Sequence, residues 1–539
     1  MPYLTRQLPH LLIYYSAHAG ACSFLATSFD AERVVGTEAF AHANYHAKFR
    51  GPDASIVQRR GGWTFLHNLL AMTGAFTTQP FVDNTTTAVF NGEIYNFREL
   101  ALELEGTEDA YVSDGFCILP AYRRWGPAFV QHLRGEFAVV VVDHASGTAV
   151  ASTDAFGTKP LWAAAWTGRL AFATYESSLA GVGVPKAERR MAPPNIATVY
   201  DLGSGHVIST LVVFQFDLRQ HKMNTLDWEK AFCTAVADRT NQAATDRRWF
   251  IGLSSGYDSG ALMLALLLQR KPFLAYSIRG KESPGVVWSR AQKCRTAPCE
   301  AVLLQVDNTT LEAERALLER RVEPYEFRHR DAGLPDALPH VSHVHKSMSA
   351  IGLSRILTLV RKRGGLIYLS GTGADETISD YAFAGREVTP GASCFGGVFP
   401  KNLTDIFPWC SFYRGTLRAF LMKEELTGGA HGIETRYPFL DPRVVQEYLW
   451  LSHDIKNSEY KRPIADFLRR YQFPNLWGAK RGFRGHRNTI AVADSTIVNN
   501  KTPDSSNAWN LHVSLDAMRR KRRRRDAALR NVGSGRTKQ

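Results

Sequence analysis

The sequence lacks several features that would each place the protein in a particular class. Its 539 residues contain no apolar run near the roughly 18 residues needed to cross a bilayer, which argues against an integral membrane protein. The seven cysteines show neither CxxC nor zinc-ligand spacing, so we expect reduced thiols in an intracellular, cytoplasmic protein. The Gly-Lys-Ser/Thr signature of a Walker-A phosphate loop is absent, as are internal repeats and coiled-coil heptads.

What is present predicts a folded protein of two domains with appendages, because 539 residues are too many for one core. From Cys22 to about residue 215, short strand-like runs cluster with few helical patterns between them, which favours an α+β layered domain. From residue 226 to about 490, apolar strands alternate with helices, which is typical of an α/β doubly wound parallel sheet. A linker is expected at about residues 215–227.

The two ends of the chain differ from the rest in composition. Residues 501–539 hold eleven Lys and Arg against three Asp, including an unbroken basic run from Arg519 to Arg525. Such a block repels itself, so we expect a disordered tail that binds nucleic acid or an acidic partner, or that is simply solvated. Residues 1–21 carry a short apolar run at 11–15 followed by small residues, which only faintly resembles a signal peptide, and we interpret them as an N-terminal extension.

A strand, a turn of small residues and a helix follow one another at residues 250–260. Gly256 lets backbone approach a ligand closely, and a helix that begins near Ser259 offers free N–H donors to an anion. Asp258 would repel a phosphate unless a metal ion lay between them. The loop therefore predicts a site for Mg²⁺ and pyrophosphate, with an ordinary turn as the alternative.

A second loop of the same kind follows the apolar strand at residues 366–369, as Ser370-Gly371-Thr372-Gly373-Ala374-Asp375-Glu376. Neighbouring strands would bring Asp258 and Asp375 together as ligands for one hard cation. The apolar segment at residues 276–278 could receive adenine, or could be plain sheet core. Lys461 could be a phosphate ligand, or it could simply lie on the exposed face of a surface helix.

The first domain contains polar residues suited to an amino-acid substrate. The amide of Asn91 and the N–H of Gly92 could together stabilise an oxyanion, although Asn-Gly is more often a turn. Arg50 lies on a rigid turn and suits a substrate carboxylate, whereas Asp114 suits an ammonium group.

Taken together, these motifs and others between them resemble the glutamine-dependent asparagine synthetase family over roughly residues 22–490. They occur in the family's order: Cys22, Arg50-Gly51-Pro52-Asp53, Asn91-Gly92-Glu93-Ile94-Tyr95-Asn96, Ser113-Asp114, Gly135-Glu136-Phe137-Ala138, Asp154-Ala155-Phe156-Gly157-Thr158-Lys159-Pro160-Leu161, Ser254–Ser259, Ser370–Glu376, Arg436-Tyr437-Pro438-Phe439-Leu440-Asp441 and Lys461.

The resemblance implies an N-terminal-nucleophile glutaminase sandwich (αββα) at residues 22–215 and an ATP-pyrophosphatase synthetase domain at 226–490. It implies glutamine, aspartate and ATP as substrates and Mg²⁺ as the metal, and it leaves the oligomeric state open, with a homodimer as one option. The implied glutaminase residues are Cys22 as nucleophile, Asn91 and Gly92 for the oxyanion, and Arg50, Glu93 and Asp114, with Asn91 and Gly92, for glutamine. The implied synthetase residues are Leu253, Ser254, Ser255, Gly256, Asp258, Ser259, Ile278, Ser370 and Gly371 for ATP, Asp258 and Asp375 for the metal, and Lys461 for the phosphates.

Three positions depart from the family pattern. Cys22 is preceded by 21 residues, although the implied mechanism needs its α-amine free, so we expect residues 1–21 to be removed, a later start, or an inactive glutaminase. Ser255 replaces a glycine. Thr372 stands where a glutamate suited to general-base work is usual, and threonine cannot take a proton at neutral pH. The acceptor could therefore differ from aspartate, as in β-lactam or peptide-cyclising synthetases, and a non-catalytic nucleic-acid-binding relative is a further alternative.

Overall fold

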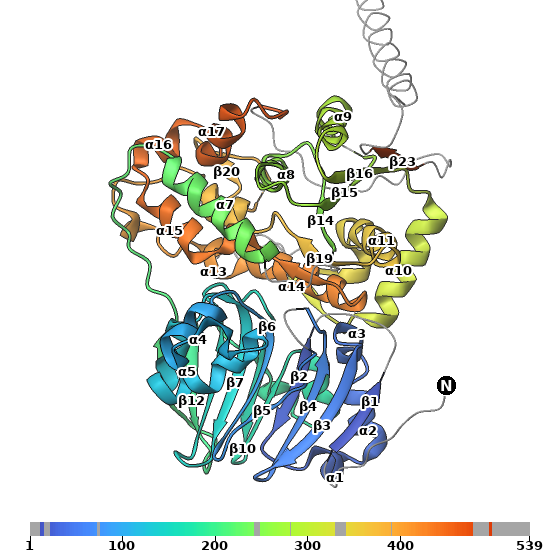
Figure 1. Ribbon diagram of the computed structural model, residues 1–539, viewed down its shortest axis with the longest axis vertical. Helices are drawn as coiled ribbons and strands as arrows, with labels where there is room; N and C mark the ends of the chain where they lie inside the picture. The colour runs from blue at the N-terminus through green and yellow to red at the C-terminus, as the bar shows by residue number, and fades with distance from the viewer. Residues whose placement is uncertain are drawn as a thin grey trace, which may run out of the picture.

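Three sheets organise the chain, two of them antiparallel in the N-terminal half and one mostly parallel in the C-terminal half (Figure 1). We use "N-terminal half" for residues 22–213 and "C-terminal half" for residues 226–477 together with 495–498. The computed structural model describes residues 11–15, 22–72, 76–241, 248–280, 282–328, 341–389, 391–477 and 495–498. Most of residues 1–21 and all of 501–539, which include the basic tail, lie outside the described residues.

The N-terminal half is built on two antiparallel sheets that face each other. The first has the order β1 (Leu11–Tyr15), β3 (Ala54–Arg60), β4 (Trp63–Leu69), β2 (Ser23–Thr27), β10 (Arg169–Ala173), β9 (Trp162–Trp166) and β11 (Arg190–Met191). The second has the order β13 (Val207–Val212), β12 (Ile196–Asp201), β8 (Thr148–Thr153), β7 (Gly135–Asp143), β6 (Thr86–Ile94) and β5 (Phe81–Val82).

Alternating side chains of these strands fill three layers of core. Phe24, Phe65 and Phe172 of the first sheet pack against Val89 and Val140 of the second, which forms the centre of the sandwich. The opposite strand faces pack against helices: α1 (Ala31–Val35), α2 (Thr37–Ala43) and α6 (Glu176–Gly181) cover the first sheet, and α4 (Phe97–Glu105) and α5 (Ile118–Trp125) cover the second. This αββα layering agrees with the predicted sandwich.

The C-terminal half contains a six-stranded sheet with four parallel strand pairs. Its order is β22 (Glu434–Arg436), β19 (Gly365–Leu369), β14 (Arg248–Gly252), β15 (Phe273–Ile278), β16 (Cys299–Leu304) and β23 (Ser495–Val498), of which only β23 pairs antiparallel. Trp249 and Ile251 face one core and Phe250 faces another, so both faces of the sheet are covered. β23 lies beyond residue 490, where the sequence led us to expect the end of this domain.

Helices flank this sheet on both sides, as the two cores require. Those in the described part of the C-terminal half are α7 (Leu226–Asn241), α8 (Tyr257–Leu268), α9 (Pro284–Gln292), α10 (Asn308–Arg321), α11 (Met348–Lys362), α12 (Ala374–Ile378), α13 (Cys410–Tyr413), α14 (Gly415–Ala430), α15 (Pro442–Trp450), α16 (His453–Ser458) and α17 (Arg462–Arg470). Two hairpins complete the half: β17 (Glu326–Arg328) with β18 (Val341–His343), and β20 (Ala382–Phe383) with β21 (Arg386–Glu387). α14 runs along the border with the N-terminal half and contacts α3 (Ala47–Arg50) there (Figure 1).

Residues that precede Cys22 take part in the first sheet. The backbone of β1 pairs antiparallel with β3, from Leu11 opposite Gln58 to Tyr15 opposite Ala54. The short apolar run of the N-terminal extension is therefore an edge strand of this sheet.

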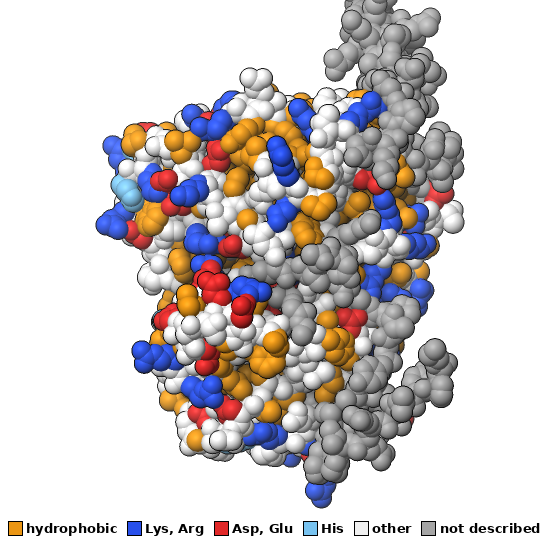
Figure 2. Space-filling model, in the orientation of Figure 1, with side chains coloured by type: hydrophobic (Ala, Val, Ile, Leu, Met, Phe, Trp, Pro, Cys, Tyr) orange, Lys and Arg blue, Asp and Glu red, His pale blue; other side chains and the backbone are white. Residues whose placement is uncertain are grey.

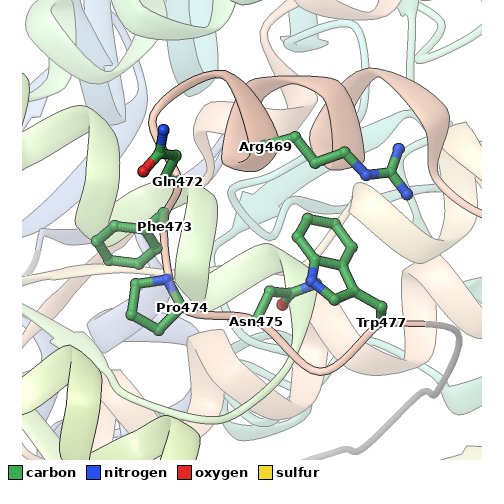
Figure 3. Close-up of a pocket in the computed structure, with 6 residues that line it drawn as sticks. All are labelled: Arg469, Gln472, Phe473, Pro474, Asn475 and Trp477. Carbon is green, nitrogen blue, oxygen red and sulfur yellow. The ribbon is translucent and has the colours of Figure 1, made fainter.

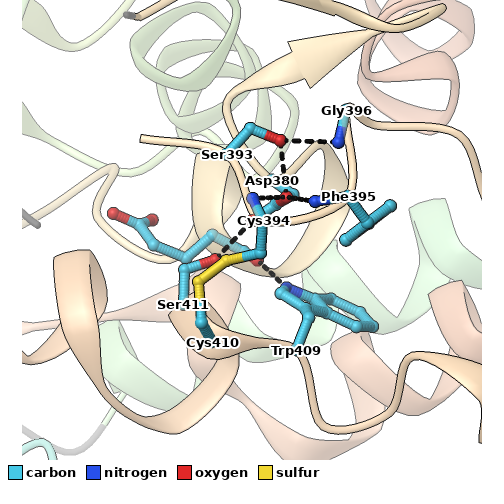
Figure 4. The surroundings of a disulfide bond; sticks show 9 residues. Asp380, Ser393, Cys394, Phe395, Gly396, Trp409, Cys410 and Ser411 are labelled. Carbon is cyan, nitrogen blue, oxygen red and sulfur yellow. Dashed lines mark hydrogen bonds between the residues drawn. A yellow bond between two sulfur atoms is a disulfide. The ribbon is translucent and has the colours of Figure 1, made fainter. Parts of the chain in front are cut away.

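The cysteines differ from the expectation that all are reduced. Cys294 forms a disulfide with Cys299, and Cys394 forms one with Cys410 (Figure 4). The second disulfide joins the loop after β21 to α13, and the carboxylate of Asp380 accepts hydrogen bonds from both segments, including 2.7 Å from the backbone N of Cys394 and 2.7 Å from Ser411 Oγ. The prediction of reduced thiols is wrong for these four residues, whereas Cys22, Cys117 and Cys233 are free. Among the described helices, none has the length and apolar character needed to span a bilayer.

Candidate active sites

Cys22 directly precedes β2, a central strand of the first sheet, and is half-buried. Its Sγ accepts a hydrogen bond from the backbone N–H of Leu70 at 3.2 Å and lies 3.4 Å from the carbonyl oxygen of the same residue. Burial raises the pKa of the Cys22 thiol well above its ordinary value, against the smaller lowering effect of the Leu70 N–H. The sulfur is therefore held as a neutral thiol, which needs a base before it can act as a nucleophile.

Arg50 ends α3 and connects Cys22 to the next candidate residue. Its Nε donates to the carbonyl oxygen of Cys22 at 2.8 Å, and its Nη2 lies 3.5 Å from Asn91 Oδ1. The guanidinium is 1% exposed and also reaches into the C-terminal half, where Nη1 donates to the backbone oxygen of Glu425 at 3.0 Å and Nη2 pairs with the Glu425 carboxylate. The arginine that the sequence suggested for a substrate carboxylate is thus bound to a carboxylate of the protein itself.

Asn91 and Gly92 lie side by side in β6. The Nδ2 of Asn91 is buried and has no hydrogen-bond partner among the described residues, an arrangement that costs free energy unless a ligand oxygen accepts from it. Gly92 has φ +129°, and a Cβ there would lie 1.9 Å from the carbonyl oxygen of Glu136. Only glycine fits this backbone, so the sharp course of the strand beside Asn91 is fixed by the sequence.

Two buried carboxylates complete the group around Cys22. Glu93 pairs with Arg436 Nη2 at 3.2 Å, and Asp114 accepts a hydrogen bond from the backbone N–H of Ile94 at 2.9 Å. Burial, followed by repulsion from Glu434, raises the pKa of Asp114 to about 7. The structure therefore brings Cys22, Arg50, Asn91, Gly92, Glu93 and Asp114 together at the end of the N-terminal half that faces the C-terminal half.

A buried network of charges crosses the border between the halves next to this group. Glu425 of α14 is its centre, because it contacts Lys159 Nζ at 3.1 Å and accepts from Tyr437 OH at 2.9 Å in addition to binding Arg50. Lys159 also lies 3.5 Å from Glu136. Although burial alone would raise it, Lys159 and Arg50 hold the pKa of Glu425 below its ordinary value. On the visible face of the molecule, further acidic and basic side chains lie next to each other along this border (Figure 2).

The second group of candidate residues lies at the carboxyl ends of β14, β15 and β19. Ser254 and Ser259 close the loop before α8, since their Oγ atoms are 2.7 Å apart and the N–H of Gly256 donates to Ser254 Oγ at 3.1 Å. The buried side chain of Arg290 supports the loop from behind by donating to the backbone oxygens of Ser254 at 2.6 Å and Gly256 at 2.9 Å.

A pocket of about 540 Å³ lies beside Arg290, lined by Arg469, Gln472, Phe473, Pro474, Asn475 and Trp477 (Figure 3). The guanidinium of Arg469 lies over the Trp477 ring at 4.6 Å from its centroid, and Arg290 Nε donates to the backbone oxygen of Pro474 at 2.8 Å. One arginine therefore joins the pocket wall to the back of the Ser254–Ser259 loop.

This loop already holds an anionic group. The backbone N–H of Ser255 donates to Glu282 Oε2 at 2.6 Å, and the Ser255 hydroxyl bonds to the same carboxylate oxygen. The serine that replaces a glycine of the family pattern therefore adds a hydroxyl donor to the anion site. The loop binds a carboxylate in the way that a phosphate would be bound.

Asp258 and Asp375, predicted as ligands of one metal ion, both contact the ammonium of Lys461. Lys461 Nζ lies 2.6 Å from Asp258 Oδ1 and 2.8 Å from Asp375 Oδ1. Burial would lower its pKa, but the two aspartates raise the pKa of Lys461 well above its ordinary value. The two loops are also close, because a Cβ on Gly371 would lie 3.0 Å from Asp258 Cβ. Two carboxylates that already share a cation in this way fit the ligand set of a Mg²⁺ ion.

The other residues expected to contact ATP lie at the same edge. Leu253 is fully buried, and its N–H donates to the backbone oxygen of Tyr276 at 2.7 Å; Ile278 ends β15 and is 5% exposed. Ser370 follows β19, and its N–H donates to the backbone oxygen of Arg436 at 2.9 Å. Arg436 thus connects the second loop to Glu93 of the first group.

Sequence reasoning missed two acidic residues of α14. Glu425 binds Arg50, and Glu424 accepts hydrogen bonds from Ser370 Oγ at 2.6 Å and from Thr372 Oγ1 at 3.0 Å. The helix sequence carries no turn or spacing signal that would have found them. The only hint is a pair of adjacent acids in an otherwise largely apolar helix.

Comparison with known proteins agrees with this picture. The sequence model of a glutamine amidotransferase domain matches residues 21–206, the region that contains Cys22 and its neighbours. Together with the αββα sandwich, the match shows that the N-terminal half is similar to a glutamine amidotransferase domain.

Relatives extend the likeness beyond that half. Proteins of Mycobacterium tuberculosis and Mycobacterium bovis, provisionally named glutamine-hydrolysing asparagine synthetases, are 34% identical over 184 residues, which is 31% of this chain but only 27% of their own length. The glutamine-hydrolysing asparagine synthetase of Gallus gallus is 25% identical over 486 residues, covering 80% of this chain and 79% of that protein. Over most of its length the chain is therefore similar to glutamine-hydrolysing asparagine synthetases. Among solved structures, glutamine phosphoribosylpyrophosphate amidotransferase from B. subtilis covers 65% of this chain and 82% of its own at 12% identity, with a TM-score of 0.29 that is too low to compare folds.

Proposed function

We propose that the protein is a glutamine-hydrolysing asparagine synthetase. It activates aspartate as acyl-AMP with release of pyrophosphate and then amidates it with ammonia taken from glutamine. The observation that carries the proposal is the pairing of two sites across one border, with the Cys22 group on one side and Asp258, Asp375 and Lys461 on the other. The relatives that cover most of the chain have the same activity in their names. Residues 22–215 would be the glutaminase domain, and the unit that begins at residue 226 would be the ATP-pyrophosphatase synthetase domain.

At the glutaminase site, Cys22 Sγ attacks the carboxamide carbon of glutamine, and the α-amine of the same residue takes the thiol proton. The unpartnered Nδ2 of Asn91 supports this assignment, since it offers a donor to the oxyanion beside the N–H of Gly92. Glu93 and Asp114 receive the ammonium group of glutamine. Arg50 receives its carboxylate, which requires the guanidinium to release the side chain of Glu425.

A free α-amine on Cys22 requires that the peptide bond to Ala21 is cut. We infer that the active protein lacks residues 1–21, either because they are removed or because synthesis starts later, although β1 pairs with β3 in the structure. Mass spectrometry of the active protein tests this directly. An intact Met1 terminus on a protein that hydrolyses glutamine would contradict the inference.

At the synthetase site, the Ser254–Ser259 loop holds the phosphates of ATP in place of the Glu282 carboxylate. Leu253, Ile278, Ser370 and Gly371 contact the rest of the nucleotide. Asp258 and Asp375 would hold Mg²⁺, which when bound supplies positive charge to the pyrophosphate group. Lys461 stabilises the charge that develops on the phosphates while the aspartate β-carboxylate attacks the α-phosphorus.

Thr372 favours one alternative, a related amide-forming synthetase of the β-lactam or peptide-cyclising type with another carboxylic acid as acceptor. The two possibilities differ in the acid that supports pyrophosphate release. We expect release with ATP, Mg²⁺ and aspartate, together with asparagine formation from either ammonium or glutamine. If aspartate supports no release and another acid does, the acceptor assignment is wrong but the synthetase assignment stands. If no acid supports release, the proposed function is wrong.

A further inference from the structure

Glu424 does not belong to the Ser370–Glu376 loop but contacts it from a neighbouring helix. It lies on α14, whereas its two carboxylate oxygens accept hydrogen bonds from two hydroxyls of the loop that follows β19, Ser370 Oγ at 2.6 Å and Thr372 Oγ1 at 3.0 Å. The N–H of Thr372 in turn donates to Ser370 Oγ at 3.1 Å. A carboxylate is thus bound to Thr372, whose own side chain cannot accept a proton at neutral pH.

The loop's own acids are committed to other partners. Asp375 pairs with Lys461 and accepts from Tyr460 OH, both at 2.8 Å. Glu376 is 1% exposed, accepts from the N–H of Gly373 at 2.9 Å at the start of α12 and also bonds to Tyr381 OH. Among the described residues, Glu424 is therefore the acid that contacts Ser370 and Thr372 without serving the cation or a helix cap.

Its neighbour on α14 serves the other site. Consecutive residues of a helix point about 100° apart, so Glu424 and Glu425 leave the helix in different directions. Glu425 contacts Arg50 and Lys159 at the glutaminase border, and Glu424 contacts the synthetase loop. One helix therefore supplies one carboxylate to each candidate site.

We propose that Glu424 is the proton acceptor of the amide-forming step and performs the chemistry that residue 372 cannot. The inference rests on the proposed function. The nitrogen lone pair of ammonia forms the C–N bond to the acyl carbon, and an N–H proton moves to a carboxylate oxygen of Glu424. The bond from the acyl carbon to the AMP oxygen then breaks, and its electron pair leaves with AMP.

The surroundings of Glu424 suit this role. Burial raises the pKa of its carboxyl, more strongly than Lys423 and the two hydroxyls lower it, so the carboxylate is a better base than an exposed glutamate. Tyr368, Tyr437 and Glu425 are further titratable groups that interact with it, and the negative charge of Glu425 works in the same direction as burial. The hydroxyls of Ser370 and Thr372 fix the orientation of the carboxylate.

The experiment separates adenylation from amide formation in the full-length protein. Glu424→Gln keeps the size of the side chain and an oxygen acceptor for the loop but cannot take a proton. We expect acid-dependent exchange of pyrophosphate into ATP to change by less than about threefold, and amide formation from ammonium to fall by about 10²-fold or more. The matched control is Glu312→Gln, the loss of an exposed glutamate on α10, which should change neither rate.

A second variant tests the link to position 372. Adding Thr372→Glu to Glu424→Gln returns a carboxylate to the loop itself, and we expect it to restore amide formation at least about tenfold over Glu424→Gln alone. Equal losses of exchange and amide formation in Glu424→Gln would show a purely structural residue and overturn the inference, as would unchanged amide formation. Absence of acid-dependent exchange in the unaltered protein would instead overturn the proposed function, and the inference with it.

Discussion

The two candidate sites satisfy their polar groups in different ways. Around Cys22, the amide donor of Asn91 has no partner among the described residues, and Arg50 already holds the carboxylate of Glu425. Around Asp258, each charged group already has an internal partner: Lys461 lies between the two aspartates, and Glu282 lies in the anion loop. In the proposed function both sites exchange internal ions for those of a substrate, but the first site also holds an amide donor that is ready for the oxyanion.

The largest expected effect removes one site and leaves the other. Cys22→Ala should lower glutamine-dependent amide formation by about 10⁴-fold or more, because the substitution removes the sulfur that forms the thioester in the proposed mechanism. The ammonium-dependent rate should stay within about twofold, since the adenylation site is untouched. Parallel assays with the two nitrogen donors measure both values. An equal loss with both donors would contradict the separation of the sites.

The reverse experiment uses Lys461→Met. Pyrophosphate release should fall by about 10²- to 10³-fold, because charge on the leaving phosphates loses its fixed cation and the two aspartates are left facing each other. Glutamine hydrolysis should change far less. Arg462→Met is the matched control. It removes a neighbouring cation that bonds to Asp466 on its own helix, and it should change neither rate appreciably. A loss of glutaminase equal to the loss of pyrophosphate release would mean that the sites are not independent.

A change at the border should weaken both sites through stability. Glu425→Ala leaves Arg50 and Lys159 buried without their shared carboxylate, which should reduce the free energy of unfolding by about 3–5 kcal/mol. Denaturant titration measures this loss. Asp227→Ala removes an exposed partner of Lys222 and should cost about 1 kcal/mol or less. If the two variants lost similar amounts of unfolding free energy, the border network would not make the expected contribution to stability.

The smallest effect is a pH dependence confined to the first site. The pKa of Asp114 is raised to about 7 by burial and by Glu434, so its carboxyl is protonated below that pH and loses its attraction for the ammonium group of glutamine. The KM for glutamine should rise by about tenfold as the pH falls from about 8 to about 6, and the KM for ammonia, calculated on the concentration of free NH3, should not follow it. Asp114→Asn should have a high KM that varies little with pH. A pH dependence that survives this substitution would assign the titration to another group.

Local signals carried much of what could be predicted. Asn91-Gly92 and the Ser254–Ser259 loop each consist of consecutive residues next to or within a strand. Each includes glycine, so the backbone requirements of a few neighbouring residues are enough to predict both as candidate sites. The clustered strand-like runs likewise predict a layered α+β domain in the N-terminal half, and the resemblance to the family implies its sandwich. Such rules need only neighbours in the sequence.

The rest depends on contacts between distant segments, which a single sequence does not encode locally. Glu425 is 375 positions from Arg50, and nothing in α14 marks it as the partner of a glutaminase residue. Cys394 and Cys410 are 16 positions apart without a recognisable motif, so their bond was not expected. The run at residues 11–15 was interpreted from its composition alone, and its pairing with β3 depends on the shape of the completed sheet.

The reach of Arg50 into α14 matters to anyone who would express the first half alone. A truncated protein ending near residue 215 would keep Cys22 and Asn91 but would leave the guanidinium of Arg50 without the carboxylate that now fixes it. Because that same guanidinium holds the carbonyl oxygen of Cys22 at 2.8 Å, the fragment would carry the proposed nucleophile on a loosened backbone. A reagent glutaminase made from this chain should therefore include α14, supplied either in the same polypeptide or as a second one.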